Sequence, residues 1–85
     1  MKDFDAETDV LVYTTTLTNH DFLVALLELY FPVPRETAVR IAEEAKRIGK
    51  ATVATLPKKQ AVKAVMDASD ASRCLRQAIR FELLA

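Results

Sequence analysis

Three short segments with the residue patterns of β-strands stand at the start, the middle and the end of this chain. Val10–Tyr13 consists of β-branched, aliphatic and aromatic residues, which favour extended backbone. Ala51–Leu56 alternates between small polar and apolar residues, and Ile79–Leu83 alternates strictly, so each predicts a strand with one buried face. Any fold of this chain therefore has to bring together strands that lie far apart in the sequence.

The interval after the first strand begins with the pattern of an amphipathic helix. Thr18 is expected to cap this helix by accepting a hydrogen bond from the backbone of Asp21, whose negative charge suits the first turn. Phe22, Leu26 and Tyr30 then recur at helical spacing and define an apolar face. Two prolines follow directly, so the helix is expected to end before them.

Two further helices are predicted by the same periodicity. The second begins near Pro34 and ends before Gly49, the only glycine of the chain, at a position where helices commonly end in a left-handed residue. The third begins at Pro57. The residues expected to be buried are Ala38, Ile41, Ala42, Ala45 and Ile48 in the second helix, and Ala61, Val62, Val65, Ala68 and either Ala71 or Ser72 in the third.

The resulting order of strand, helix, helix, strand, helix, strand predicts an α+β domain with two layers. We expect a βααβαβ domain in which a three-stranded antiparallel sheet carries three helices on one face. A sheet of three strands is small, so packing against the helices has to supply most of the stability. The domain is expected to span residues 9–85, after a short flexible N-terminal segment at residues 1–8.

The composition excludes several classes of function. Lys and Arg number 12, as do Asp and Glu, so the chain lacks the basic excess of nucleic-acid and membrane-surface binders. No apolar run approaches the about 20 residues of a spanning helix. One His and one Cys cannot supply a zinc site, an intrachain disulfide or a convincing nucleophile and base pair. We therefore expect a cytoplasmic protein-binding module without catalytic residues, cofactor or metal.

A set of residues from about Asp9 to the C-terminus follows the pattern of a known family. They are Val10-Leu11-Val12, Thr18, Asp21-Phe22-Leu23-Val24, Leu27, Phe31, Glu36, Ala38, Ile41, Gly49-Lys50, Ala61 and the segment Ile79–Leu83. Together with the order of elements, they resemble the ClpS adaptor family, which delivers proteins to Clp AAA+ proteases in bacteria and plastids. The resemblance implies the ClpS fold over nearly the whole chain.

The resemblance also implies a ligand pocket. ClpS proteins of the N-degron pathway bind the free amino-terminal end of a substrate whose first side chain is bulky and apolar. Their Asn-Asp pair and His, which hold the α-amino group, correspond here to Thr14, Thr15 and Lys46. The remaining candidate pocket residues are Val12, Thr18, Leu23, Ala42, Ala45 and Ile79, with His20 at the position of a gating methionine.

These replacements change the chemistry that the pocket can serve. An unpaired ammonium loses several kcal/mol when it leaves water, and Lys46 would repel it. We therefore do not expect ordinary recognition of a protonated N-terminus, and we expect hydroxyls and a cation to suit a neutral or anionic group. For His20 the alternative is an exposed first-turn residue with no part in binding.

The family docks on the N-domain of a Clp AAA+ unfoldase through its third helix. The positions of its Glu and Lys fall here on Lys59 and Ala64. The candidate docking residues for an acidic partner are Lys58, Lys59 and Lys63, which we call the lysine ridge. The alternative is that these lysines form an ordinary solvated face.

The expected function is to bind a protein or peptide and to deliver it to, or regulate, a Clp protease. The alternative is a domain like that of the ribosomal stalk protein, which shares this fold, or another interaction domain unrelated to Clp.

Overall fold

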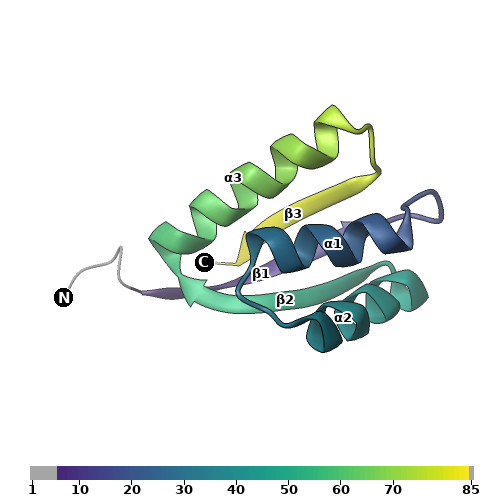
Figure 1. The fold of residues 1–85 in the computed structure, drawn as a ribbon. Helices are drawn as coiled ribbons and strands as arrows, with labels where there is room; N and C mark the ends of the chain where they lie inside the picture. The colour runs from purple at the N-terminus through teal and green to yellow at the C-terminus, as the bar shows by residue number, and fades with distance from the viewer. Residues whose placement is uncertain (1–5, 85) are drawn as a thin grey trace.

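The structure, a computed structural model, describes residues 6–84 and contains three strands and three helices (Figure 1). In chain order they are β1 (Glu7–Thr14), α1 (His20–Tyr30), α2 (Arg35–Ile48), β2 (Lys50–Pro57), α3 (Lys58–Cys74) and β3 (Ile79–Leu84). This order and the α+β class confirm the prediction from the sequence. No helix of the described residues combines the length and the apolar character that crossing a bilayer requires.

The sheet is antiparallel throughout and has the strand order β2-β1-β3, so β1 is the central strand. The register of β1 against β2 shifts after Val10, which pairs with Ala54 while Leu11 pairs with Thr52. The residue left between them, Val53, forms a bulge. Because side chains alternate between the two faces of a strand, this extra residue lets both Val53 and Leu56 point toward the helices, where they are 4% and 6% exposed.

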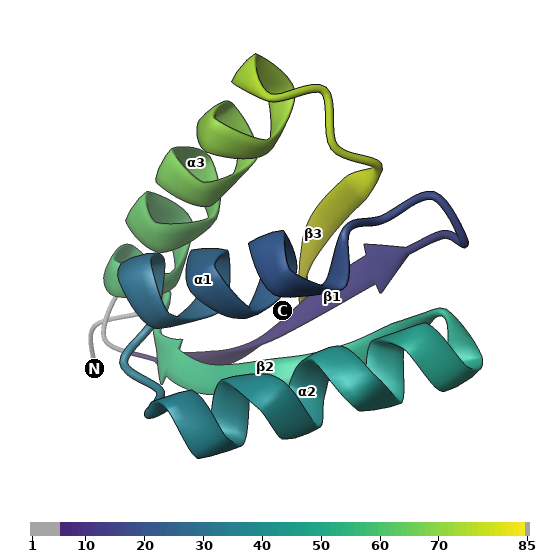
Figure 2. The ribbon, with the colours of Figure 1, turned by 45° about the vertical axis from the view of Figure 1, so that its right-hand side comes forward.

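The three helices cover one face of the sheet, as the sequence predicts (Figure 2). Helix α1 lies between α2 and α3, while α2 packs on β2 and α3 on β3. Alanines on the buried faces of α2 and α3 allow these helices to approach the sheet closely. The core between the layers includes Val10, Val12, Leu27, Ala38, Ala42, Ala45, Ala61 and Ala68, each fully buried.

The ends of the elements differ from the prediction in three places. Helix α3 begins at Lys58 and not at Pro57, because Pro57 ends β2 and is the cap residue of the helix. Helix α1 is capped by Asn19, whose side chain accepts a hydrogen bond from the Phe22 amide at 2.8 Å, so the prediction of Thr18 as the cap is wrong by one residue. Strand β1 begins at Glu7, earlier than the sequence pattern predicts, because Thr8 pairs with Leu56 and is buried. Of the N-terminal segment expected to be flexible, residues 1–5 lie outside the described part.

Burial follows the predicted stripes with two corrections. Ile48 is 55% exposed in the last turn of α2, although Ala38, Ile41, Ala42 and Ala45 are buried as expected. In α3 the buried row is Ala61, Ala64, Ala68 and Ser72. Val62 lies one position away from this row and is exposed, so it was wrongly assigned to the core. Gly49 has φ 90°, which confirms the predicted left-handed residue at the end of α2.

Candidate functional site

A hollow of about 190 Å³ lies at the end of the sheet where β1 leads into α1. Its walls come from the last residue of β1, the loop that follows, α1 and α2. They are Thr14, Thr15, Thr16, Thr18, Leu23, Ala42 and Lys46. Six of the ten residues predicted for the pocket therefore line one hollow. The predicted set omitted Thr16, and the signal that points to it is the uninterrupted run of threonines at residues 14–16.

The other four predicted residues lie elsewhere. Val12 and Ala45 are fully buried in the core behind the hollow. Ile79 lines a second and wider hollow on the β3 side of Thr14 and Thr15. His20 is the first residue of α1, where it is half-buried and outside the lining of both hollows.

The floor of the first hollow is apolar. It is formed by Leu23, which is 2% exposed, and by Ala42, which is fully buried. An alanine at this position of α2 leaves space that a longer side chain would fill. An apolar cavity of about 150 Å³ is large enough to hold a benzene molecule. The hollow therefore has room for one aliphatic or phenyl side chain.

The strand end beside the hollow is fixed by two hydrogen bonds to α2 and its cap. The Thr14 hydroxyl donates to the carbonyl oxygen of Ala45 at 3.0 Å. The Thr14 amide donates to the carbonyl oxygen of Gly49 at 2.9 Å. These bonds join the end of β1 to the end of α2, which form two walls of the hollow.

The loop at the mouth of the hollow is closed by its own threonines. The Thr15 amide donates to the Thr18 hydroxyl at 3.0 Å, and the Thr18 amide donates to the Thr15 carbonyl at 3.1 Å. The Leu17 amide donates to the Thr15 hydroxyl at 3.1 Å. The Thr18 hydroxyl in turn donates to the carbonyl of Ala78 at 2.5 Å, which fastens the loop to the start of β3. Thr18 therefore positions the mouth instead of capping the helix.

Positive charge dominates the lining of the hollow. Lys46 is exposed and is its one charged residue among the residues that the structure describes.

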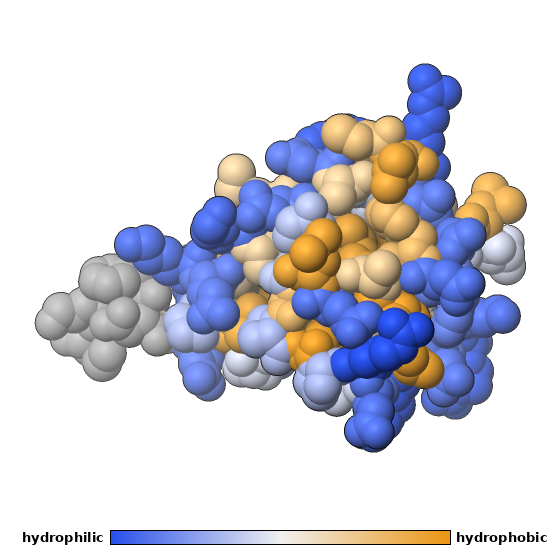
Figure 3. Space-filling view, viewed as in Figure 1, coloured by the Kyte–Doolittle hydropathy of each residue, from blue (hydrophilic) through white to orange (hydrophobic). Residues whose placement is uncertain are grey.

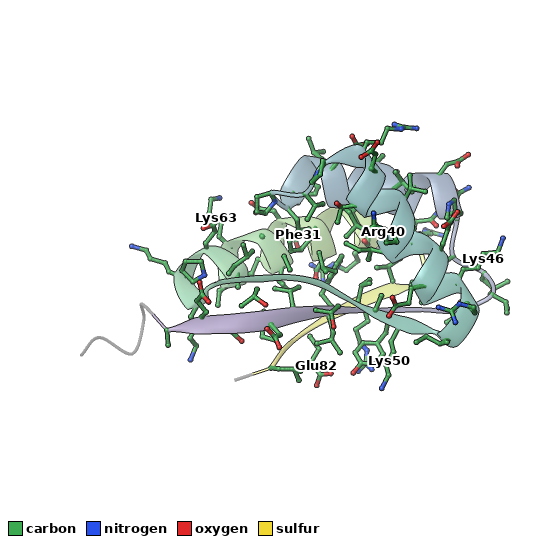
Figure 4. All side chains as sticks on the ribbon, turned by 90° about the horizontal axis from the view of Figure 1, so that it is seen from below. Phe31, Arg40, Lys46, Lys50, Lys63 and Glu82 are labelled. Atoms are coloured by element: carbon green, nitrogen blue, oxygen red, sulfur yellow. The ribbon has the colours of Figure 1, made fainter. Side chains whose placement is uncertain are left out.

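The carboxylate of Glu82 lies away from the hollow, on the outer face of the sheet, where it accepts a hydrogen bond from the Tyr13 hydroxyl at 2.7 Å (Figure 4). This bond raises the pKa of Tyr13. The Arg80 guanidinium stacks over the Tyr13 ring at 4.7 Å on the same face.

The lysine ridge lies far from the hollow. Lys58, Lys59 and Lys63 are exposed at the start of α3, and Figure 4 shows Lys63 and Lys46 at opposite ends of the molecule. The Lys63 ammonium lies 3.2 Å from the Asp67 carboxylate.

Apolar side chains gather on the surface where α1 and α3 meet (Figure 3). The exposed apolar residues of these two helices include Leu29, Val62 and Met66.

Comparisons with known proteins agree with this architecture. The family model described as "ATP-dependent Clp protease adaptor protein ClpS" matches residues 5–82. The structure of ClpS2 from Agrobacterium tumefaciens, bound to L-phenylalaninamide, is similar with a TM-score of 0.84 and 20% sequence identity, over 93% of this chain and 95% of that one. Among curated proteins, none matches this sequence.

Proposed function

This chain belongs to the ClpS adaptor family, and on that premise we propose that it binds the end of a protein or peptide in the hollow and presents it to a Clp AAA+ unfoldase. The observation that carries this proposal is the family match over residues 5–82, nearly the whole domain. The same match favours an adaptor over a domain like that of the ribosomal stalk.

The residues at the mouth of the hollow support a ligand different from a free amino terminus. L-Phenylalaninamide, the ligand of the similar ClpS2 structure, carries a free amino group and no carboxylate. Thr14, Thr15 and Lys46 stand at the positions that hold the amino group in the ClpS pattern. An ammonium there would have no carboxylate of the described lining to neutralise it and would be repelled by Lys46. We therefore propose that ordinary N-degrons are not the ligands of this protein.

The exposed face of α3 supports docking of the unfoldase. Lys59, Val62, Lys63 and Met66, which we call the docking stripe, follow the spacing of residues that share one side of a helix. Val62 is 37% and Met66 60% exposed, so the stripe combines apolar surface with flanking charge. Protein interfaces commonly have an apolar centre and a polar rim. The lysines favour a partner whose facing surface is acidic.

The docking proposal is tested by calorimetric titration with the isolated N-domain of the Clp unfoldase from the same cell. The wild-type protein is expected to bind. Met66→Asp places a charge in the apolar part of the stripe and is expected to weaken binding at least about tenfold. Lys59→Glu is expected to weaken binding as well and to reduce its dependence on salt.

The matched control is Lys46→Gln, which removes a lysine charge at the opposite end and is expected to leave N-domain affinity unchanged. Failure of the wild-type protein to bind the N-domain would contradict the adaptor role. Unchanged binding by Met66→Asp would exclude the docking stripe while leaving the adaptor role intact.

A further inference from the structure

The mouth of the hollow offers hydrogen-bond donors that are not committed within the protein. The Thr15 hydroxyl accepts from the Leu17 amide, so its own proton remains available. Among the described residues, none of the hydrogen bonds that hold this loop involves the Thr16 hydroxyl. Lys46 adds an ammonium group that forms no ion pair with the described residues. Three neighbouring side chains can therefore donate to one ligand.

The hydrogen-bond acceptors among the side chains at the same mouth are neutral hydroxyls, and some already accept a bond from within the protein. The Thr18 hydroxyl already accepts from the Thr15 amide, and no carboxylate stands among the described lining residues. A cationic ligand would thus meet neutral oxygens beside a lysine. An anionic ligand would receive charge-assisted hydrogen bonds, which are shorter and stronger than neutral ones.

The apolar floor lies directly beneath these donors. Leu23 and Ala42 can bury one side chain, while Thr15, Thr16 and Lys46 stand at the mouth above it. The last residue of a polypeptide satisfies both parts at once, because its carboxylate is attached to the carbon that bears its side chain. An internal Asp or Glu does not, because its carboxylate ends the side chain and would leave the floor empty.

We infer that the hollow binds the C-terminal residue of a polypeptide, with an aliphatic or phenyl side chain against Leu23 and Ala42 and the α-carboxylate held by Thr15, Thr16 and Lys46. The inference rests on the proposed function, because it assigns a ligand to the same hollow. The fixed loop supports it, since Thr15 is held by the loop's hydrogen bonds and its hydroxyl loses little conformational freedom on binding. The ligand has the polarity opposite to L-phenylalaninamide.

The test is a titration of the whole chain with short Gly-Ser peptides that have blocked N-termini and differ at the last residue. A peptide ending in leucine with a free carboxylate is expected to bind. The same peptide ending in leucine amide is expected to bind at least about tenfold more weakly. A peptide ending in glycine with a free carboxylate tests the apolar floor and is expected to bind more weakly than leucine. One ending in aspartate amide tests a side-chain carboxylate and is expected not to bind.

Two variants separate a specific contact from general charge. Lys46→Gln is expected to weaken binding of the leucine acid about tenfold and to leave the leucine amide unaffected. Arg47→Gln removes the same charge from the next residue, which is exposed and outside the lining, and is expected to keep the wild-type affinity. An equal loss in both variants would overturn the assigned contact with Lys46.

The inference is overturned if the leucine acid does not bind, if its amide or the aspartate amide binds as tightly, or if L-phenylalaninamide binds more tightly than the acid. The N-domain titration described above keeps this failure distinct from failure of the proposed function. A protein that binds the N-domain but not the leucine acid remains an adaptor with a different ligand.

Discussion

The two ends of this molecule hold their polar groups in different ways. At the hollow, Thr15 and Thr18 bond to each other, Thr14 bonds to α2, and Thr18 bonds to Ala78 just before β3. At the lysine ridge, Lys58 and Lys59 extend into solvent, and the contact of Lys63 with Asp67 is an exposed pair within one helix. At the first end hydrogen bonds fix the loop that carries the threonines, and at the second the lysines are exposed on a helix surface.

The contrast indicates which end can discriminate between ligands. Donors held in place favour one ligand geometry over another, since little freedom is lost when they bind. Exposed lysines attract an acidic surface and accelerate encounter, but they lose side-chain entropy on contact and are screened by salt. We therefore expect selectivity to come from the hollow and association rate from the ridge.

The largest effect is expected at the floor of the hollow. Leu23→Ala removes a side chain that is 2% exposed and should lower the free energy of unfolding by about 3 kcal/mol, within the range for buried leucines. Urea denaturation measures this loss. Leu17→Ala is the control, because Leu17 is 85% exposed and its loss should change stability by less than about 0.5 kcal/mol. Equal effects of the two changes would mean that the floor is not packed.

A smaller effect is expected at the mouth. Thr18→Val keeps the shape of the side chain but removes the bond that it accepts from Thr15 and the bond that it donates to Ala78. The loss should be about 1 to 2 kcal/mol, measured by the same denaturation. Thr16→Val should change stability little, because in the described part of the chain none of the hydrogen bonds that hold this loop involves that hydroxyl. If Thr18→Val left the free energy of unfolding unchanged, the Thr18 hydroxyl would not be what fastens the loop.

The smallest effect is expected at the lysine ridge. Lys63→Ala removes an exposed ion pair, in which the lysine precedes the acid along the helix, the less favourable orientation. The free energy of unfolding should change by less than about 0.5 kcal/mol, and added salt should reduce the difference further. A loss above about 1 kcal/mol would contradict the contrast between the two ends, since it would give the ridge a structural role.

The helices and strands could be predicted because their determinants are local. The strands at Ile79–Leu83 and Ala51–Leu56 are recognised from the alternation of neighbouring residues. The end of a helix is recognised in the same way from a single glycine. The cap of α1 could not be predicted, because the hydroxyl of Thr18 is used by Ala78, 60 positions away. Both Thr18 and Asn19 are suitable caps, and only the tertiary contact decides between them.

The candidate site was predictable in part. The resemblance to ClpS marked Thr14, Thr15 and Lys46, and the structure brings these three residues to one hollow. Whether a small residue such as Ala42 leaves open space depends on how closely its neighbours pack, which no sequence pattern states. His20 was assigned as a gate from its sequence position alone, and the structure places it at the start of α1, outside the lining.

The central position of β1 has a consequence for the kinetics of folding. The first strand to be synthesised has both of its partners later in the chain, and the pairing of Asp9 with Leu84 spans almost the full sequence. Closing such long loops costs entropy before any contact compensates for it. We therefore expect the sheet to form late, after the helices, and to fold more slowly than a helical bundle of equal length.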